Sequence, residues 1–163
     1  MVRFLSLLIM LVAPLVKAAT ITLDDTQMEC LAKNVYFEAR NQSHVGKIAV
    51  AQVVLNRVID KRYPMSICEV VEQAYTHKNG FPIRHKCQFS WFCDGLSDEP
   101  RDVAAWQDAL RMASDAVLLW NASFDVTEGS THYHTKDVFP KWRKSFTHTT
   151  ATSSRLTWSQ ASK

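Results

Sequence analysis

The stretch VGKIAVAQVVLNRVI, residues 45–59, is apolar on nearly every side of a helix. A helix with apolar side chains all round is buried rather than amphipathic. We therefore predict that residues 45–59 form the central helix, with the other elements packed around it. Gln52 and Asn56 are the polar exceptions, four residues apart on one face, and buried amides need hydrogen-bond partners. They either bond loop backbone, which is the interpretation we favour for Asn56, or line a polar pocket, which we expect of Gln52.

Further helices and a small β-element are expected on both sides of this stretch. Residues 25–39 carry apolar side chains at spacings of three and four, which predicts an amphipathic helix. The other expected elements are a short helix opened by a capping box of Ser66 and Glu69 and ending near Ala74, a long loop at 76–99, a helix at 100–120, a strand at 130–138 and an edge strand at 156–158. The pattern predicts an α+β fold that is mainly helical.

Composition places the chain among globular single domains. It has 163 residues, of which 47% are hydrophobic and 21% charged, which excludes an intrinsically disordered chain. Lysine and arginine number 19 against 16 acidic residues, a net charge of +3. This excess is too small to indicate a nucleic-acid-binding protein. We expect the protein to be a monomer.

Residues 1–18 have the pattern of a cleavable signal peptide. Arg3 precedes an apolar run from Phe4 to Val16, and Ala18 ends a small-residue cleavage site. The run of about thirteen residues is too short for the ~30 Å hydrocarbon core that an uncleaved membrane anchor would have to span. We therefore expect export to the periplasm, the cell wall or the medium, no membrane insertion after cleavage, and a mature domain at residues 19–163.

The four cysteines favour two disulfides, because their number is even and the chain is expected to be exported. Cys30, Cys68, Cys87 and Cys93 allow three pairings, among which the sequence does not choose. The alternative is a zinc site that joins Cys87 and Cys93 to His77 or His85. The five residues between Cys87 and Cys93 are not a usual zinc spacing, and we expect neither a metal nor a cofactor.

Glu38 is the most unusual acidic residue. On a helical wheel it lies beside Leu31 and Val35, on the edge of the apolar stripe. Lost hydration favours the neutral form of a carboxyl group and raises its pKa, which suits a general acid. The alternative is a helix-end carboxylate that forms an ion pair with Arg40 or Arg57.

Two other segments carry side chains suited to binding sugars. His132 and His134 share one face of the predicted strand and Tyr133 lies on the other. The histidine pair resembles metal ligands, but no third ligand is obvious, so we expect polar strand residues that line a sugar cleft. Residues 88–92, Gln-Phe-Ser-Trp-Phe, bring together amide, hydroxyl and aromatic groups, although a small hydrophobic cluster would have the same composition.

The chain resembles the SleB-like cell-wall hydrolases, which include spore-cortex-lytic enzymes. The similarity spans residues 34–142 and lies in several motifs that follow one another in the family's order. They are Asn-Val-Tyr-Phe-Glu-Ala-Arg at 34–40, Ala-Val-Ala-Gln-Val-Val-Leu-Asn-Arg-Val at 49–58, Tyr-Pro at 63–64 with Ile-Cys-Glu-Val-Val at 67–71, Cys-Gln-Phe-Ser-Trp at 87–91 with Cys-Asp-Gly at 93–95, and His-Tyr-His-Thr at 132–135 with Pro-Lys-Trp at 140–142.

The resemblance implies a lysozyme-like core and a peptidoglycan-cleaving glycosidase. The family's catalytic glutamate falls on Glu38, and its members resemble lytic transglycosylases that cut between N-acetylmuramic acid and N-acetylglucosamine. The residues we expect at the glycan are Tyr36, Gln52, Gln88, Phe89, Ser90, Tyr133 and His134. Many relatives have glycine-glutamate where this chain has Asn41 and Gln42, which leaves one acid fewer.

Three alternatives stay open at this point. Asp94 lies in a matching motif of the sugar loop and would permit a hydrolytic variant of the glycosidase. A zinc-dependent amidase or peptidase would use His132 and His134 on the wall peptide. A non-catalytic protein would bind the wall without cutting it.

Overall fold

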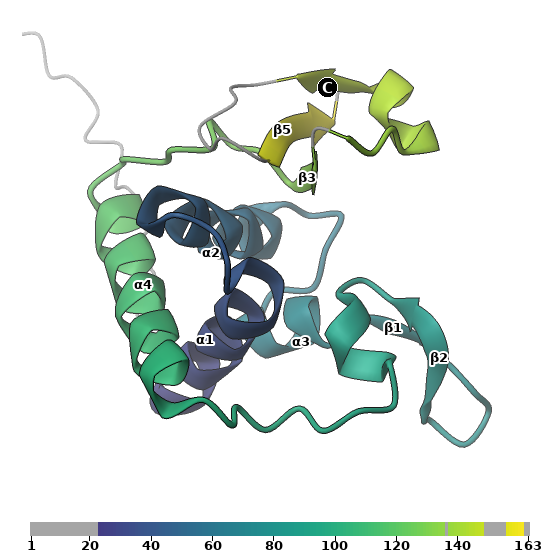
Figure 1. The fold of residues 1–163 in the computed structure, drawn as a ribbon. Coiled ribbons are helices and arrows are strands. Elements are labelled where there is room, and N and C mark those ends of the chain that lie inside the picture. The colour runs from purple at the N-terminus through teal and green to yellow at the C-terminus, as the bar shows by residue number, and fades with distance from the viewer. Residues whose placement is uncertain (1–22, 136, 149–155, 162–163) are drawn as a thin grey trace, which may run out of the picture.

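Three long helices form the body of the protein and two small sheets flank it (Figure 1). The computed structural model describes residues 23–135, 137–148 and 156–161; the expected signal peptide lies outside these residues. The elements in chain order are α1 (Asp25–Ala39), α2 (His44–Ile59), α3 (Ile67–Val71), β1 (Ala74–Thr76), β2 (Pro82–Cys87), η1 (Ser90–Cys93), α4 (Val103–Asn121), β3 (His132–Thr135), η2 (Lys141–Ser145), β4 (Phe146–His148) and β5 (Leu156–Ala161). None of the helices in this described part has the length and apolar character needed to cross a membrane.

Helix α2 is the buried centre, as its composition predicts. Every residue from Ala49 to Arg57 is buried. Leu31 and Val35 of α1 and Ala113 of α4 have no exposed surface and belong to the same core cluster. The apolar stripe predicted for residues 25–39 is therefore the face that α1 turns to the core.

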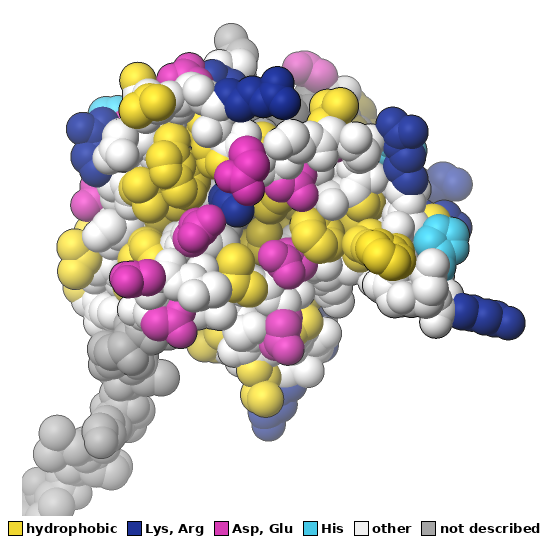
Figure 2. All heavy atoms as spheres, turned by 90° about the horizontal axis from the view of Figure 1, so that it is seen from below, with side chains coloured by type: hydrophobic (Ala, Val, Ile, Leu, Met, Phe, Trp, Pro, Cys, Tyr) yellow, Lys and Arg dark blue, Asp and Glu magenta, His cyan; other side chains and the backbone are white. Residues whose placement is uncertain are grey.

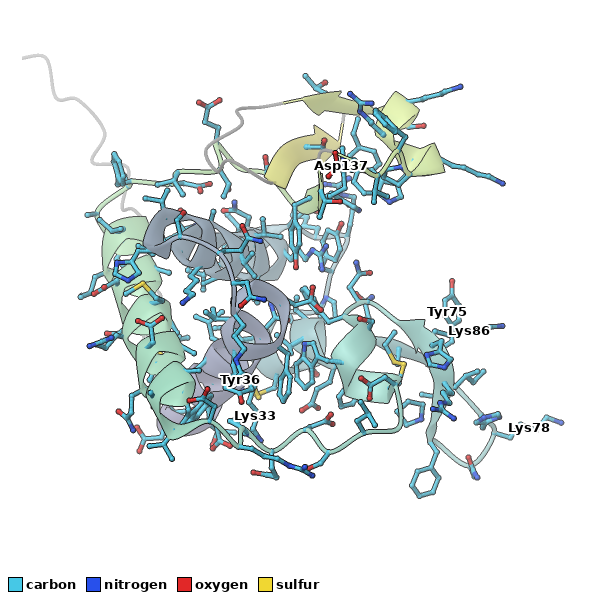
Figure 3. All side chains as sticks on the ribbon, viewed as in Figure 1. Lys33, Tyr36, Tyr75, Lys78, Lys86 and Asp137 are labelled. Atoms are coloured by element: carbon cyan, nitrogen blue, oxygen red, sulfur yellow. A yellow bond between two sulfur atoms is a disulfide. The ribbon has the colours of Figure 1, made fainter. Side chains whose placement is uncertain are left out.

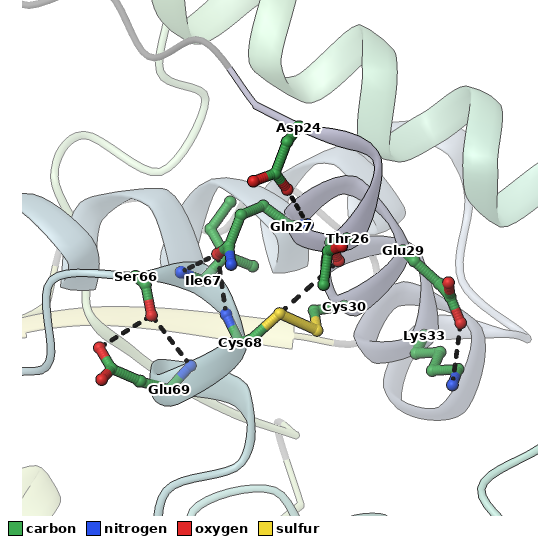
Figure 4. The surroundings of a disulfide bond; sticks show 10 residues. All are labelled: Asp24, Thr26, Gln27, Glu29, Cys30, Lys33, Ser66, Ile67, Cys68 and Glu69. Atoms are coloured by element: carbon green, nitrogen blue, oxygen red, sulfur yellow. Dashed lines mark hydrogen bonds and ion pairs between the residues drawn. A yellow bond between two sulfur atoms is a disulfide. The ribbon is translucent and has the colours of Figure 1, made fainter.

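Side-chain caps set the starts of the helices. The Asp24 carboxylate accepts from the backbone N–H of Gln27 at 2.8 Å at the start of α1. The Ser66 hydroxyl accepts from the N–H of Glu69 at 3.3 Å and donates to its carboxylate at 2.8 Å (Figure 4). The expected cap at Ser66 is confirmed, but α3 ends at Val71 rather than near Ala74.

The prediction of a long loop at 76–99 is wrong, because this region contains part of a β-hairpin and a 3-10 helix. Strands β1 and β2 pair antiparallel, with Ala74 opposite Cys87, and the N–H of Gln88 donates to the carbonyl of Gln73 at 2.8 Å. The strands are short, irregular in register and largely exposed. They therefore lack the alternation of apolar and polar residues by which a strand is detected in sequence.

The second sheet has the order β3-β5-β4, with both pairs antiparallel. The strand expected at 130–138 is confirmed over His132–Thr135. The strand expected at 156–158 exists but is not an edge strand, since β5 lies between β3 and β4. It pairs with β4, which precedes it directly, and also with the more distant β3, and this second pairing places it in the centre of the sheet.

Both expected disulfides form, as Cys30–Cys68 and Cys87–Cys93. The first joins α1 to α3, beside the Gln27 side chain, which accepts from the N–H groups of Ile67 and Cys68 at 2.7 and 3.1 Å (Figure 4). The second joins β2 to η1. Cys87 and Cys93 are therefore bonded to each other, and the zinc site considered for them is wrong.

Candidate active site

Glu38 faces a cavity of about 280 Å³ between the helical body and the two sheets. It lies in the last turn of α1 and is half-buried. The residues that line this cavity, which we call the Glu38 cavity, are Glu38, Arg57, Cys87, Gln88, Phe89, Ser90, His132, Tyr133 and Trp142. Among these lining residues Glu38 is the one carboxylate.

The Glu38 carboxyl group is placed between opposing electrostatic effects. Burial raises its pKa, whereas a hydrogen bond from Tyr133 and the charge of Arg57 lower it, and burial dominates. The Tyr133 hydroxyl donates to Oε2 of Glu38 at 3.1 Å. The group is therefore held closer to its protonated form than an exposed glutamate, with a donor and a cation nearby that stabilise the carboxylate once the proton has left.

The ion pair considered for Glu38 does not form. Arg40 instead pairs with Asp102 at 2.5 Å. Arg57 lies among the cavity residues but makes no ion pair with Glu38 within 4.0 Å, and acts on it only as a nearby charge.

Arg57 ties the two sides of the cavity together. It is 3% exposed, and its Nε donates to the carbonyl of Thr131 at 2.8 Å. Its guanidinium lies over the rings of Tyr63 and Phe89, 5.3 and 5.1 Å from their centroids. With the Gln88 amide oxygen turned toward it, Nη2 of Arg57 donates to that oxygen at 3.2 Å. This one side chain from α2 thus contacts both the hairpin end and the approach to β3.

An aromatic wall closes the cavity on the side of the second sheet. The His132 ring lies 5.1 Å from Trp142 and 4.4 Å from Phe146 between centroids. Burial, together with the charges of Arg57 and Arg62, lowers the pKa of His132 to about 4. His132 is therefore a neutral ring at neutral pH, suited to packing against a sugar rather than to binding an anion.

Four of the residues predicted at the substrate lie in the Glu38 cavity. Gln88 and Ser90 are exposed there, Tyr133 bonds to Glu38, and Phe89 lines it although only 3% of its surface is exposed. Phe89 has little surface to offer a ligand, and its clearest contact is with Arg57.

Gln52 does not line the Glu38 cavity, although we expected it at the sugar. It has no exposed surface; its Nε2 donates to the carbonyl of Phe124 at 2.8 Å, and its Oε1 accepts from the N–H of Val126 at 2.9 Å. Asn56 bonds Asp125, Thr127 and the carbonyl of Ser130 in the same loop. Both amides of α2 therefore hold the loop that leads into β3, as expected for Asn56 but not for Gln52.

Tyr36 and His134 also lie outside the Glu38 cavity. Tyr36 is 5% exposed and its hydroxyl accepts from the N–H of Asp102 at 3.2 Å, on the side of α1 near the start of α4 (Figure 3). His134 is 8% exposed and packs edge-on against Trp142, with centroids 5.6 Å apart. Contrary to the prediction that both lie at the sugar, neither residue lines the cavity around Glu38, and both take part in packing.

Arg57 and Trp142 are cavity residues that were not predicted from the sequence, whereas His132, expected in a sugar cleft, does line the cavity. Each lies within one of the motifs that carry the family resemblance, which was the available signal. Asp94, the second acid considered, does not line this cavity; its side chain accepts from the N–H of Leu96 at 2.7 Å. Across the described ranges, no three His, Cys, Asp or Glu side chains are grouped so that they could share a metal ion.

Comparison with solved structures identifies the fold. The catalytic domain of the germination-specific lytic transglycosylase SleB from Bacillus anthracis is 20% identical, with a TM-score of 0.61 over 85% of this chain and 97% of that one. The catalytic domain of the Bacillus cereus SleB protein is also 20% identical, with a TM-score of 0.58 over 84% and 92%. The expected mainly helical, lysozyme-like fold class is confirmed.

Comparison of sequences identifies the family. No curated protein matches the chain. The profile of the cell wall hydrolase family matches residues 41–156, which is most of the chain and begins just after Glu38. The protein belongs to the cell wall hydrolase family.

Proposed function

We propose that this enzyme cleaves the glycan of peptidoglycan between N-acetylmuramic acid and N-acetylglucosamine, as a lytic transglycosylase with Glu38 as its general acid and base. The observation that carries the proposal is a single carboxyl group of raised pKa, bonded to Tyr133, in a cavity lined by amide, hydroxyl and aromatic side chains. The family match and the SleB fold support a substrate in the wall.

One acidic residue is sufficient for this reaction. Protonated Glu38 gives its proton to the glycosidic oxygen, the bond from that oxygen to the anomeric carbon breaks, and the next sugar leaves as an alcohol. The C6 hydroxyl of the same muramic acid bonds to the anomeric carbon and returns its proton to the Glu38 carboxylate. Glu38 ends protonated, as it began, and no water is consumed.

A hydrolase that uses two carboxylates fits the cavity less well. Such enzymes place the second carboxyl group roughly 5 to 10 Å from the first, either to attack the sugar or to activate water. The lining of the Glu38 cavity includes no second acid, and the Asp94 side chain bonds the N–H of Leu96. In the transglycosylase reaction Tyr133 and Arg57 would stabilise the carboxylate during the interval between the two proton transfers.

The proposed binding residues are those that combine exposure with a place in the cavity. Gln88 and Ser90 offer an amide and a hydroxyl to sugar hydroxyls, while Trp142 and His132 offer flat faces. A substrate in the wall is reached only by an exported protein, so the proposal includes export and cleavage of residues 1–18.

Mass spectrometry of the fragments released from purified sacculi tests the proposal. We expect muropeptides with 1,6-anhydromuramic ends, about 18 mass units (one water) lighter than the products of hydrolysis by a two-carboxylate enzyme. Reducing ends would make the enzyme a lysozyme-type hydrolase. Free peptides with intact glycan would indicate an amidase or peptidase, and binding without release would indicate a wall-binding protein.

A further inference from the structure

A second groove lies along the β-hairpin, next to residues that also line the Glu38 cavity. It has a volume of about 440 Å³ and is lined by Gln73, Ala74, Tyr75, Lys86, Cys87 and Gln88. Cys87 and Gln88 also line the Glu38 cavity. The two spaces therefore adjoin at Cys87 and Gln88, and we call the second one the hairpin groove.

The β-hairpin is positively charged, and Lys86 is the charged residue that lines the groove. Residues 73–88 include Lys78, Arg84 and Lys86 but no Asp or Glu; the nearest acid in the sequence is Glu72. Arg84 is engaged, since its Nε donates to the carbonyl of Asp94 at 2.9 Å. Lys86 is exposed, and within the described ranges no carboxylate lies within ion-pair distance of it. Its ammonium group is therefore available to a ligand.

Tyr75 stands beside this charge. Its side chain is 75% exposed, and Figure 3 shows Tyr75 and Lys86 next to each other on the hairpin, with Lys78 at its far end. Since Tyr75 and Lys86 both line the groove, they present an aromatic face and a cation to the same space. This pair suits a ligand that carries both an apolar part and a carboxylate.

The underside of the helical body is more acidic, and Figure 2 shows acidic side chains gathered there. A separate hollow is lined by Asp25, Glu29 and Glu99, with Lys33 as its one cation. An anionic ligand would be repelled from this face and attracted to the hairpin. The charge distribution thus favours approach of an anionic ligand from the side of the hairpin.

We propose that the hairpin groove binds the peptide stem of the glycan strand through its carboxylates, next to the sugar that Glu38 protonates. The inference rests on the proposed function, because it takes the glycan of the Glu38 cavity as given. Muramic acid carries its peptide beside the bond to be cut, and the stem ends in carboxylates. Lys86 would bind a carboxylate and Tyr75 the aliphatic part of the stem, so the enzyme would prefer glycan with stems to stripped glycan.

Binding measurements with paired ligands test this preference. The ligands are two soluble tetrasaccharides of alternating N-acetylglucosamine and N-acetylmuramic acid, one with peptide stems and one without. The proteins are Glu38→Gln, which leaves the ligand intact, and the same protein with Lys86→Ala, Lys86→Arg or Lys78→Ala. Lys78→Ala is the matched control, since it removes the same charge from the same hairpin outside the groove.

We expect Lys86→Ala to weaken binding of the stem-bearing ligand about three- to fivefold, the upper range for an exposed ion pair. Binding of the stripped ligand should not change, Lys86→Arg should retain affinity, and Lys78→Ala should have no effect. High salt should reduce the difference between the ligands, because it screens exposed charges. Circular dichroism and melting curves would verify that each variant is folded.

Two results would overturn the proposal. Equal weakening of both ligands by Lys86→Ala would mean that the groove holds sugar, and equal weakening by Lys78→Ala would mean general attraction of anions to the hairpin. The proposed function fails separately: reducing ends from wild-type digestion of sacculi would contradict the transglycosylase mechanism, while the binding comparison of the two ligands in the Glu38→Gln background would stay valid.

Discussion

The two walls of the Glu38 cavity are built in opposite ways. The helical wall supplies half-buried Glu38 from α1 and buried Arg57 from α2. The facing wall supplies Gln88 from the end of an exposed hairpin, Ser90 from the start of η1 and Tyr133 from the short strand β3. The acid of raised pKa thus lies on the helical wall, and the exposed amide and hydroxyl groups lie on the facing wall. We infer that the helical wall provides the chemistry and the facing wall the recognition.

The largest effect should come from Glu38→Gln. It preserves the shape of the side chain and removes the proton donor, so cleavage of sacculi should fall by ~10² or more, the usual contribution of a general acid. Because burial in the folded protein raises the pKa of Glu38, its ionised form costs stability as the pH rises through that pKa. The neutral variant should therefore melt at the same temperature as the wild type or higher at pH 7 to 8. Near wild-type cleavage would remove Glu38 from the mechanism.

Loss of one disulfide should mainly lower stability, and loss of the other should mainly lower activity. Cys30 and Cys68 close a separation of 38 residues, for which the loss is about 4 kcal/mol on the chain-entropy estimate. Cys87 and Cys93 close only 6 residues, for which the same estimate is about 2 kcal/mol. Replacing the first pair by serine should mainly lower the denaturant midpoint. Replacing the second should mainly lower cleavage, since it frees the segment that holds Gln88 and Ser90.

An unfolding titration and a turbidity assay on sacculi measure both quantities for each double variant. The comparison of the two walls fails if loss of Cys87–Cys93 destabilises the protein more than loss of Cys30–Cys68. Ellman titration of the denatured, unreduced wild type should find no free thiol.

Gln52→Ala and Gln88→Ala are matched substitutions on opposite walls. The first removes the two hydrogen bonds from Gln52 to the carbonyl of Phe124 and the N–H of Val126, which should cost about 2 kcal/mol of unfolding free energy. The second removes an exposed amide from the cavity and should lower kcat/KM about two- to tenfold, the range for one hydrogen bond, with little change in melting temperature. If Gln52→Ala reduced activity without loss of stability, Gln52 would take part in substrate binding after all.

The smallest expected effect is a shift of the pH profile in Tyr133→Phe. The wild-type rate should fall as the pH rises through the raised pKa of Glu38, because only the protonated acid starts the reaction. The hydrogen bond from Tyr133 opposes that rise in pKa, so its removal should move this limb to higher pH, by less than about one unit. A pH series of kcat/KM measures the shift. A limb that moves to lower pH would show that Tyr133 does not stabilise the carboxylate.

The parts of the fold that sequence reasoning predicted are those with strong local signals. The buried helix at 45–59, the stripe at 25–39 and the cap at Ser66 each depend on residues within a few positions of one another. Glu38 was identified for the same reason, from its place beside Leu31 and Val35. The hairpin of β1 and β2 was missed, because three- and six-residue exposed strands leave no periodic pattern.

The amides of α2 show the limit of reasoning from one helix. Periodicity places Gln52 and Asn56 on one buried face and indicates that both need partners. It does not indicate whether the partner is a ligand or a loop some 70 residues later, and the structure gives both to the loop at 124–130.

The sequence alone thus determined the helices, the number of disulfides, the raised pKa of Glu38 and, through its motifs, the family, because local spacing and composition carry these features. Only the tertiary structure decided the cysteine pairing, the central place of β5 and which residues meet at Glu38. Tyr133 bonds Glu38 across 95 positions of sequence, and Arg57 reaches the hairpin and the approach to β3 at once. Such contacts follow from how whole elements pack, and no local pattern specifies them.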